Sequence, residues 1–281
     1  KFYNTTVTAA GEPELPESVE SLSISGAAAG GTPITVEKTL EDETLYAWKG
    51  ELQAGEFKIN VNDTDAFLSV ADANFEGTPS GYSIAFDGGS YTVPAAGSYR
   101  IIVDTEAATV EVRDEEHDLK NKSVSYNNTV DNVNPYTQEV TVLWMWGGFN
   151  SFSTESGMKT GFDSDYTLTQ SMADPCLFVY HGEVLPRLSA VDANNNNERK
   201  TGFIKFLVSN IENNVYAYGS TANAKRNDHS GYLENIGLGE THTLVKGQGD
   251  NRYAYFIIPE NVNYVEVDIE NLTVIFDNRP L

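Results

Sequence analysis

Apolar and polar residues alternate over short stretches along most of the chain. In FKINVN (57–62), Phe57, Ile59 and Val61 alternate with lysine and asparagine. YRIIVD (99–104) and YVEVDIENLTVIF (264–276) also read as short strands. A period of two is typical of half-buried β-strands, and no convincing apolar face has the helical period over more than a turn or two. The pattern therefore predicts an all-β protein built from short strands.

The chain also repeats itself. Its landmarks, each given as first copy and then second copy, are ITVEKTL (34–40) and YTLTQSM (166–172), LYAWKGEL (45–52) and LFVYHGEV (177–184), GEFKINV (55–61) and GFIKFLV (202–208), and VDTEAATV (103–110) and VDIENLTV (267–274). Pro94 precedes Tyr99 at the same spacing at which Pro259 precedes Tyr264. Ordered landmarks at nearly constant spacing indicate a duplicated domain.

The length of 281 residues suits two domains of ordinary size. Short strands in units of about 100 to 150 residues are typical of immunoglobulin-type β-sandwiches. We therefore predict two tandem immunoglobulin-like β-sandwich domains, at residues 21–113 and 136–281. Residues 1–20 are interpreted as a leader, and residues 114–135 as a linker because that region is charged and lacks an apolar period.

The second copy carries extra loop material. Its connection through VLPRLSAVDANNNNERKT (184–201) is longer than the matching connection in the first copy, and residues 218–249 are rich in glycine, asparagine and histidine. Long loops on a rigid sandwich are frequent sites of binding. The second domain is therefore the candidate for a ligand site.

Matching the copies assigns a face to each strand position, since alternate residues of a strand share a face. Leu22 and Ile24 match Leu143 and Met145 as the core-facing pair. On the opposite face, the first copy has Ser23 and Ser25, whereas the second copy has Trp144 and Trp146. The tryptophans have two readings: they pack under the insertion loop or against the neighbouring domain, or at least one forms an exposed aromatic platform. A tryptophan ring offers a large rigid surface to the apolar face of a sugar.

Two lysines and two aromatic residues recur in the same way. Lys58 and Lys205 both point outward, next to the inward sets of their strands. An ammonium group donates hydrogen bonds well to hydroxyls, although a lysine in a strand is often only a solvated surface residue. Trp48 corresponds to Tyr180, and either ring could lie beside the lysine or in the core.

Composition narrows the ligand class. The chain has 18 basic and 41 acidic residues, a formal charge of −23, and no cluster of lysine and arginine. Such a surface repels nucleic acid and anionic membranes, so a neutral ligand suits it best. There is a single cysteine, which excludes an intrachain disulfide, and no run of the roughly 18 apolar residues that a membrane helix needs. A start at Lys1 without methionine indicates a processed or trimmed piece.

The repeated motifs resemble a known family. The pattern [YF]-x-[WY]-x-G-E-[LV], followed by G-E-F-K-[IF], stands at residues 46–52 and 55–59 of the first copy. It is similar to the tandem domains of the SusE/SusF-type surface glycan-binding lipoproteins of Bacteroidetes, over about residues 20–112 and 136–278. The resemblance implies immunoglobulin-like domains without catalysis or cofactor, held by a lipid anchor outside this sequence on the outward face of the outer membrane. It also implies a transporter and its partner glycan-binding lipoprotein as partners.

Family sites combine aromatic platforms with a lysine, arginine or amide that contacts hydroxyls. The positions that match, together with the second tryptophan of the outward face, are Trp48, Lys58, Trp144, Trp146, Tyr180, Lys205 and Arg252. The first copy departs from the pattern at Ser25, where the second copy has a tryptophan. The second copy has Phe203 where the motif has glutamate. The expected function is non-catalytic binding of a neutral polysaccharide or oligosaccharide in support of glycan uptake, centred on the second domain. The alternative is a structural or adhesive spacer without glycan affinity.

Other chemistries find little support in the sequence. The histidines lack metal-ligand spacing, and no nucleophile elbow, P-loop or dinucleotide fingerprint is present. We therefore expect neither enzymatic activity nor a metal site. One alternative is calcium binding in the insertion, where four oxygen-bearing side chains alternate without the turn glycine of a calcium loop: Asp192, Asn194, Asn196 and Glu198.

Overall fold

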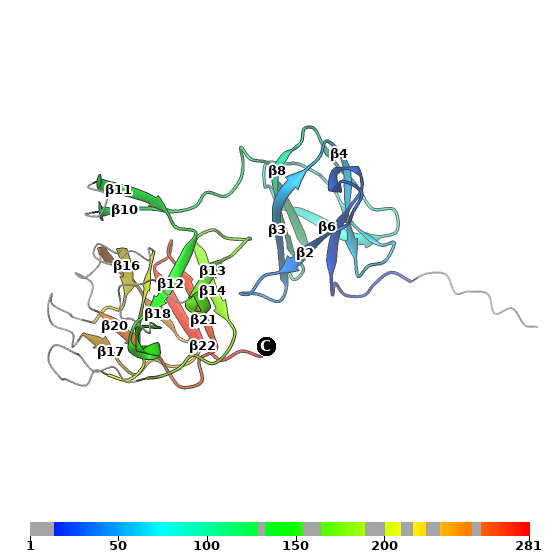
Figure 1. Cartoon of the computed structure of the whole chain (residues 1–281). Helices are drawn as coiled ribbons and strands as arrows, with labels where there is room; N and C mark the ends of the chain where they lie inside the picture. The colour runs from blue at the N-terminus through cyan, green and yellow to red at the C-terminus, as the bar shows by residue number, and fades with distance from the viewer. Residues whose placement is uncertain are drawn as a thin grey trace, which may run out of the picture. The chain divides into compact units, whose positions relative to one another are not determined.

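The computed structural model describes residues 14–128, 133–153, 164–188, 200–208, 216–222, 231–248 and 254–281. Over these ranges the elements are β-strands and three short 3₁₀ helices, and no α-helix occurs. The predicted all-β class is therefore confirmed. No helix in the described ranges is long and apolar enough to cross a membrane. The chain divides into two compact units, Lys1–Asp118 and Leu119–Leu281 (Figure 1).

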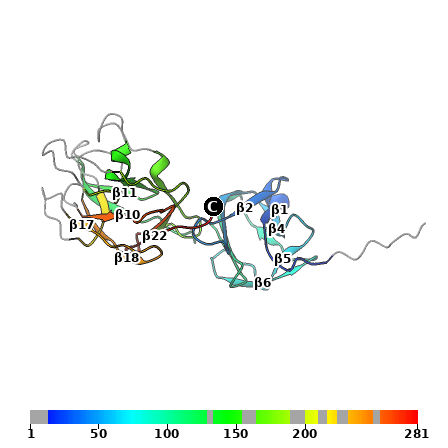
Figure 2. The ribbon, with the colours of Figure 1, turned by 90° about the horizontal axis from the view of Figure 1, so that it is seen from below.

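The described residues of the first unit, 14–118, form ten short elements. They are β1 (Leu22–Ser25), the 3₁₀ helix η1 (Ala27–Ala29), β2 (Ile34–Lys38), β3 (Leu45–Leu52), β4 (Gly55–Val61), β5 (Phe67–Val70), β6 (Ser80–Ala85), β7 (Tyr91–Val93), β8 (Gly97–Asp104) and β9 (Thr109–Arg113). Their pairing order is β1-β2-β3-β8-β9-β6-β5-β4-β7, and β1 also pairs with β4. Within the described residues, eight strands therefore close into a ring, with β7 added to β4 (Figures 1 and 2).

Two strands of this ring change partners along their length. In β2, residues 34–36 pair with β1 and residues 37–38 pair with β3. In β6, Ser80 and Gly81 pair with β9, whereas the residues from Tyr82 onward pair with β5. β2 therefore joins the ladder with β1 to the ladder with β3, and β6 joins the ladder with β9 to the ladder with β5. These two strands form two corners of the ring. The interior holds one core, to which β1, β3, β4, β8 and β9 each contribute buried side chains.

The further elements lie in the described ranges of the second unit. They are the hairpin β10 (Ser123–Asn128) and β11 (Val133–Glu139); then β12 (Val142–Trp146), η2 (Gly148–Ser153), η3 (Ser164–Tyr166), β13 (Thr167–Gln170), β14 (Leu177–His181) and β15 (Phe203–Leu207); then β16 (Tyr216–Gly219), β17 (Tyr232–Leu233), β18 (Thr241–Thr243), β19 (Val245–Gln248), β20 (Tyr255–Ile257), β21 (Tyr264–Asp268) and β22 (Thr273–Asp277).

Every strand pairing of the first unit has a counterpart in the second. The correspondence follows the order of the chain, and equivalent strands have equivalent partners. The first-unit strands β1, β2, β3, β4, β5, β7, β8 and β9 correspond, in this order, to β12, β13, β14, β15, β16, β20, β21 and β22. The single strand β6 is replaced by β18, which pairs with β22, and β19, which pairs with β16. The register agrees as well, since Ser25 lies opposite Lys58 and Trp146 lies opposite Lys205. The duplication read from the sequence therefore extends to topology and register.

The register corrects one landmark of the duplication. Tyr99 lies opposite Gly50, and the residue equivalent to it, which pairs with Gly182, is Asn263. Tyr264 lies opposite His181, as Arg100 lies opposite Lys49, so it takes the place of Arg100. The matching proline–tyrosine spacings thus conceal a shift by one residue. Because a shift of one residue reverses the face of a strand, the two tyrosines point to opposite faces.

A close backbone approach requires a glycine after β1 in the first unit and after the equivalent strand β12 in the second. Gly26 has φ 116°, and a Cβ atom there would lie 2.5 Å from the carbonyl oxygen of Glu56. Gly147 has φ 159°, and its Cβ atom would lie 2.1 Å from the carbonyl oxygen of Phe203. A side chain at Gly26 would force β1 and β4 apart, and one at Gly147 would force β12 and β15 apart.

The segment expected to be a linker, residues 114–135, contains structure. β10 lies within it and pairs with β11, and Val124 and Tyr126 of β10 are buried in the core of the second unit. The Tyr126 hydroxyl donates to Gln138, whose side-chain amide donates to the carbonyl of Val208 at 3.1 Å. The hairpin is therefore attached to the second unit by packing and by hydrogen bonds.

The residues that follow β9 are fixed to the outer face of the first unit. Asp118 accepts hydrogen bonds from Arg100 at 2.5 Å and Lys49 at 2.7 Å, and the Arg100 side chain is only 5% exposed. Burial alone would raise the pKa of Asp118, but Arg100 and Lys49 together lower it below its usual range. Removing one partner of such a pair leaves the other charge buried without compensation.

We expect Ala108→Gly to stabilise the first unit. The exposed Ala108 has φ 52°, a left-handed conformation that costs a residue with a side chain about 1–2 kcal/mol, whereas glycine adopts it freely. After the added entropy of the unfolded chain is subtracted, the net gain is about 0.5–1 kcal/mol. The free energy of unfolding is measured in urea through the fluorescence of Trp48, in a protein in which Trp144 and Trp146 are replaced by phenylalanine. The control is the neighbouring exposed Ala107→Gly, which should lower stability; equal effects of the two changes would contradict the assignment.

We expect Asp118→Asn to destabilise the first unit by about 1–3 kcal/mol at neutral pH, because it leaves Arg100 buried without a carboxylate. The pKa of Asp118 is depressed in the folded state, so its contribution is present above the unfolded pKa of about 3.9 and is lost as the pH falls through the folded pKa. The difference between the two proteins should therefore narrow in acid. The same urea experiment at several pH values tests this, with the exposed Asp65→Asn as control. A difference that does not vary with pH would exclude the ion pair as its cause.

Candidate functional site: an outer aromatic cluster on the second unit

The candidate site lies on the outer face of three paired strands, β12, β15 and β20. Trp146 pairs with Lys205, and Phe203 pairs with Ile257. Their neighbours Met145, Ile204, Phe206 and Phe256 belong to the core of the unit. Since side chains alternate between faces along a strand, the paired residues lie on the face opposite the core. There they form a separate apolar group, which we call the outer aromatic cluster: Trp146, Phe203, Tyr232, Tyr255 and Ile257.

Tyr255 is the central ring of this cluster. Its centroid lies 6.3 Å from that of Trp146 with an interplanar angle of 23°, and 6.0 Å from that of Tyr232 with an angle of 33°. Phe203 contacts Tyr255 edge-on at 5.0 Å and Tyr232 at 5.6 Å. Phe203 and Tyr255 are buried, whereas Trp146 and Tyr232 are only partly buried. The accessible rings therefore rest on a layer of buried ones.

Lys205 lies against the same rings. Its Nζ atom is 4.6 Å from the centroid of Trp146 and 5.3 Å from that of Tyr255, within the range of a cation–π interaction. The residue is 3% exposed, so its ammonium group is covered although the side chain points away from the core. The sequence predicted the direction of Lys205 but not this burial, and the ring it offered as a neighbour was Tyr180, which lies on a strand that does not pair with β15.

The first unit is polar on the corresponding face. The strand register gives a first-unit equivalent for each strand residue of the cluster, and each equivalent is polar. Trp146, Phe203, Tyr255 and Ile257 correspond, in this order, to Ser25, Glu56, Ser90 and Thr92. Only the lysine is retained, and Lys58 lies with its Nζ atom 4.5 Å from the ring centroid of Phe67. The aromatic layer is therefore an addition to the second unit that the shared fold does not require.

Trp144 lies two residues before Trp146 on the same face. Its backbone pairs with Thr167 on one side and Leu207 on the other. Its side chain is partly buried, as is that of Trp146. The two tryptophans are thus neither fully exposed nor fully covered.

Trp48 and Tyr180 have a different environment from Lys58 and Lys205. Each ring packs partly against the core of its own unit. Each also lies over the glycine two residues later, since a Cβ atom on Gly50 would lie 2.6 Å from the Trp48 ring and one on Gly182 would lie 3.2 Å from the Tyr180 hydroxyl. Burial raises the pKa of Tyr180, whose hydroxyl donates to the carbonyl of Glu183. The recurrent aromatic-x-glycine motif therefore has a packing role, and neither ring lies on a strand that pairs with the lysine strand of its unit.

Several sequence candidates lie outside the described residues. They are Arg252 and the possible calcium ligands Asp192, Asn194, Asn196 and Glu198. Among the residues that the structure does describe, no group of three or more histidine, cysteine or acidic side chains could hold a metal ion.

Sequence reasoning missed Phe203, Tyr232 and Tyr255 as members of the site. Phe203 was visible as a departure from the glutamate of the motif, and its pairing with Ile257 places it on the outer face. Tyr255 corresponds to Ser90, which becomes evident only when β20 is aligned with β7. Tyr232 comes from β17, which pairs in parallel with β20 and is not matched by any strand of the first unit.

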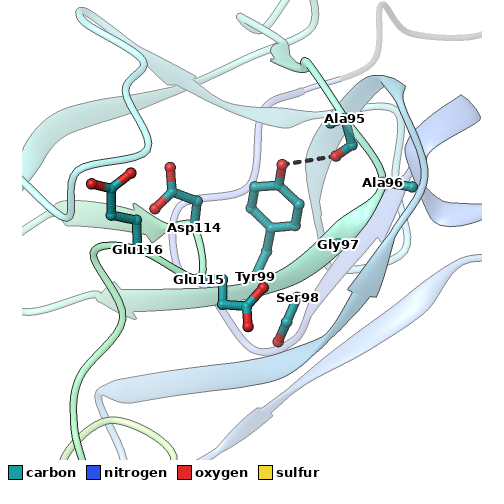
Figure 3. A pocket seen from close by; sticks show the side chains of 8 residues that line it. All are labelled: Ala95, Ala96, Gly97, Ser98, Tyr99, Asp114, Glu115 and Glu116. Atoms are coloured by element: carbon teal, nitrogen blue, oxygen red, sulfur yellow. Dashed lines mark hydrogen bonds between the residues drawn. The ribbon is translucent and has the colours of Figure 1, made fainter.

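A shallow depression of about 400 Å³ lies elsewhere, on the first unit (Figure 3). Tyr99 stands at its centre and donates from its hydroxyl to the carbonyl of Ala95 at 2.9 Å. Burial and the nearby Asp114 raise the pKa of Tyr99. Burial alone would raise the pKa of Asp114, but hydrogen bonds from His117 lower it. None of the residues predicted to bind a ligand lines this depression: its lining is Ala95, Ala96, Gly97, Ser98, Tyr99, Asp114, Glu115 and Glu116.

No protein-family model matches the chain, and no curated protein matches it in sequence.

We expect Gly148→Ala to disturb the outer aromatic cluster. A Cβ atom at Gly148 would lie 2.1 Å from the ring of Phe203, which is fully buried and has little room to move. Such overpacking costs about 1–3 kcal/mol. Urea unfolding followed through Trp144 and Trp146, with phenylalanine at 48, should show this loss.

The control for this change is Gly81→Ala, which meets no atom within 4 Å. It should leave unfolding of the first unit, followed through Trp48, unchanged within about 0.5 kcal/mol. An equally small effect of Gly148→Ala would mean that the Phe203 ring is not held in place.

Proposed function

We propose that the chain binds a neutral polysaccharide or oligosaccharide without catalysis, through the outer aromatic cluster of the second unit. The observation that carries this proposal is the replacement of a polar face in the first unit by aromatic residues at the same register in the second. A core explains apolar residues on inward positions, but these rings lie on the other side of the sheet. Partly exposed tryptophan and tyrosine rings supply rigid, amphipathic contact area at low entropic cost.

The charge of the chain supports a neutral ligand. With a formal charge of −23, the protein repels anionic glycans at long range, whereas an uncharged sugar experiences no such repulsion. Stacking on a shallow surface with a few hydrogen bonds corresponds to affinities of about micromolar to millimolar. Several sites on one surface would then gain by avidity.

The resemblance to SusE/SusF-type lipoproteins supports a setting for this activity. We infer that the units are immunoglobulin-like sandwiches, an interpretation favoured by the ladders that β2 and β6 join at two corners. The proposed place of the protein is the outward face of the outer membrane, held by a lipid anchor. A transporter and its partner glycan-binding lipoprotein are the proposed partners, and no cofactor or metal is part of the proposal.

A structural role is the second candidate, and one observation favours it. Phe203 and Tyr255 are almost completely buried, so the cluster also fixes β17 to the sheet. In this reading the rings stabilise the second unit, which serves as a spacer or adhesive module without glycan affinity.

We expect Trp146→Ala to weaken glycan binding by about tenfold or more, because truncation of a large ring at the centre of a contact typically removes over 1.4 kcal/mol. Affinity gels containing starch, mixed-linkage β-glucan, mannan, xylan or dextran measure the retardation of wild type and variant. The matched control is Ser25→Ala, at the equivalent position of the first unit, which should migrate like wild type. Absence of retardation on every gel, or retardation that Trp146→Ala leaves unchanged, would count against the proposal and favour the spacer.

A further inference from the structure

We infer that Lys205 is a positioning residue: its ammonium group fixes the rings of Trp146 and Tyr255, so that Trp146 and Tyr232 present the contact surface, and it does not itself bind the sugar. The inference rests on the proposed function, because it assigns roles within the same site.

Burial is the first reason. Lys205 is 3% exposed, which leaves its ammonium group almost no surface to offer to a ligand hydroxyl. The accessible members of the cluster are instead Trp146, Tyr232 and Ile257, which are only partly buried. A ligand that approaches this face meets their rings and side chains before it meets the lysine.

Ring geometry is the second reason. The Nζ atom lies 4.6 Å from the Trp146 centroid and 5.3 Å from the Tyr255 centroid, so one cation contacts two rings that are themselves stacked. A partly exposed tryptophan side chain has several rotamers, and a cation held against it favours one of them. Because Tyr255 also contacts Tyr232 at 6.0 Å, the lysine acts on both accessible aromatic residues.

The first unit supplies an internal comparison. Lys58 has the same register as Lys205 and also lies over an aromatic ring, that of Phe67. It is only partly buried, and its strand partner is Ser25 instead of a tryptophan. Both copies therefore retain a lysine–aromatic contact on this face, but only in the second copy does that contact include rings of the outer aromatic cluster.

Fluorine NMR of the full chain labelled with 5-fluorotryptophan tests the inference. The three tryptophans give three resonances, which single Trp→Phe variants assign. Lys205→Met keeps the length of the side chain but removes its charge, and it should shift or broaden the Trp146 resonance while the Trp48 resonance stays in place. Lys205→Arg should return the Trp146 resonance towards its wild-type position, since a guanidinium group also stacks on rings. Lys58→Met, the matched control, should leave all three resonances unchanged.

The same variants are then run on the affinity gels that best retard the wild type. Lys205→Met should weaken retardation about 3-fold to 30-fold, the range of a cation–π contact, and Lys205→Arg should restore most of it. An unchanged Trp146 resonance in Lys205→Met would overturn the inference. So would a Lys205→Arg variant that restores the resonance but not the retardation, because the lysine would then contact the sugar directly.

Two further outcomes are also decisive. If Lys205→Met does not fold, the wild type alone answers the question: ring currents should shift the Lys205 ε-methylene protons upfield of those of exposed lysines, and a normal shift would contradict the assigned geometry. If no polysaccharide retards the wild type, the proposed function fails, while the fluorine resonances still decide whether Lys205 fixes the rings.

Discussion

The pairing of β12 with β15 is the constraint on which the candidate site depends. It places Trp146 opposite Lys205, and the pairing of β15 with β20 adds Tyr255 and Ile257 beside them. The hydrogen-bonded register determines which side chains face the core, and a slip by one residue would exchange the two faces. Gly147 makes this pairing possible, since any side chain there would collide with the carbonyl of Phe203. The same device occurs at Gly26 of the first unit, so the scaffold is common to both units and the outer residues differ.

The difference between the outer residues of the two units shows which residues the fold requires and which it does not. The first unit builds a closed ring of strands and a complete core with serine, glutamate and threonine on the outer face. The second unit keeps the same pairings and adds a layer of rings there. Aromatic residues that a sister unit lacks at equivalent positions are the strongest sign of a role specific to the second unit. Whether that role is contact with a glycan or attachment of β17 depends on the accessible rings, Trp146 and Tyr232.

Much of this arrangement was predictable from the sequence, because equivalent positions of the two copies could be compared. Comparison of LSISG (22–26) with LWMWG (143–147) placed Trp144 and Trp146 on the outer face, and the shared motif around Lys58 and Lys205 predicted their common register. The alternation of residues along a strand does not show whether a side chain on the outer face is covered by its neighbours, however, and so the burial of Lys205 was not predicted. The facing of Trp48 and Tyr180 was ambiguous because their strand neighbours Ala47 and Val179 are also apolar and buried. Tyr232 was missed because β17 is too short to show a period and pairs in parallel with a distant strand. The tyrosine landmark was wrong by one residue, since equal spacing from a proline does not fix the register of the following strand.

The central claim is that the outer face of the second unit contacts a neutral sugar through its accessible rings, Trp146 and Tyr232. The most direct measurement is the tryptophan emission of a Trp48→Phe variant, in which only Trp144 and Trp146 remain, during titration with each polysaccharide of the panel. The account predicts that at least one neutral polysaccharide changes the emission in a saturable manner, and that Trp146→Ala weakens retardation by the same polysaccharide. Emission that no polysaccharide changes, or retardation that Trp146→Ala leaves unchanged, would contradict it.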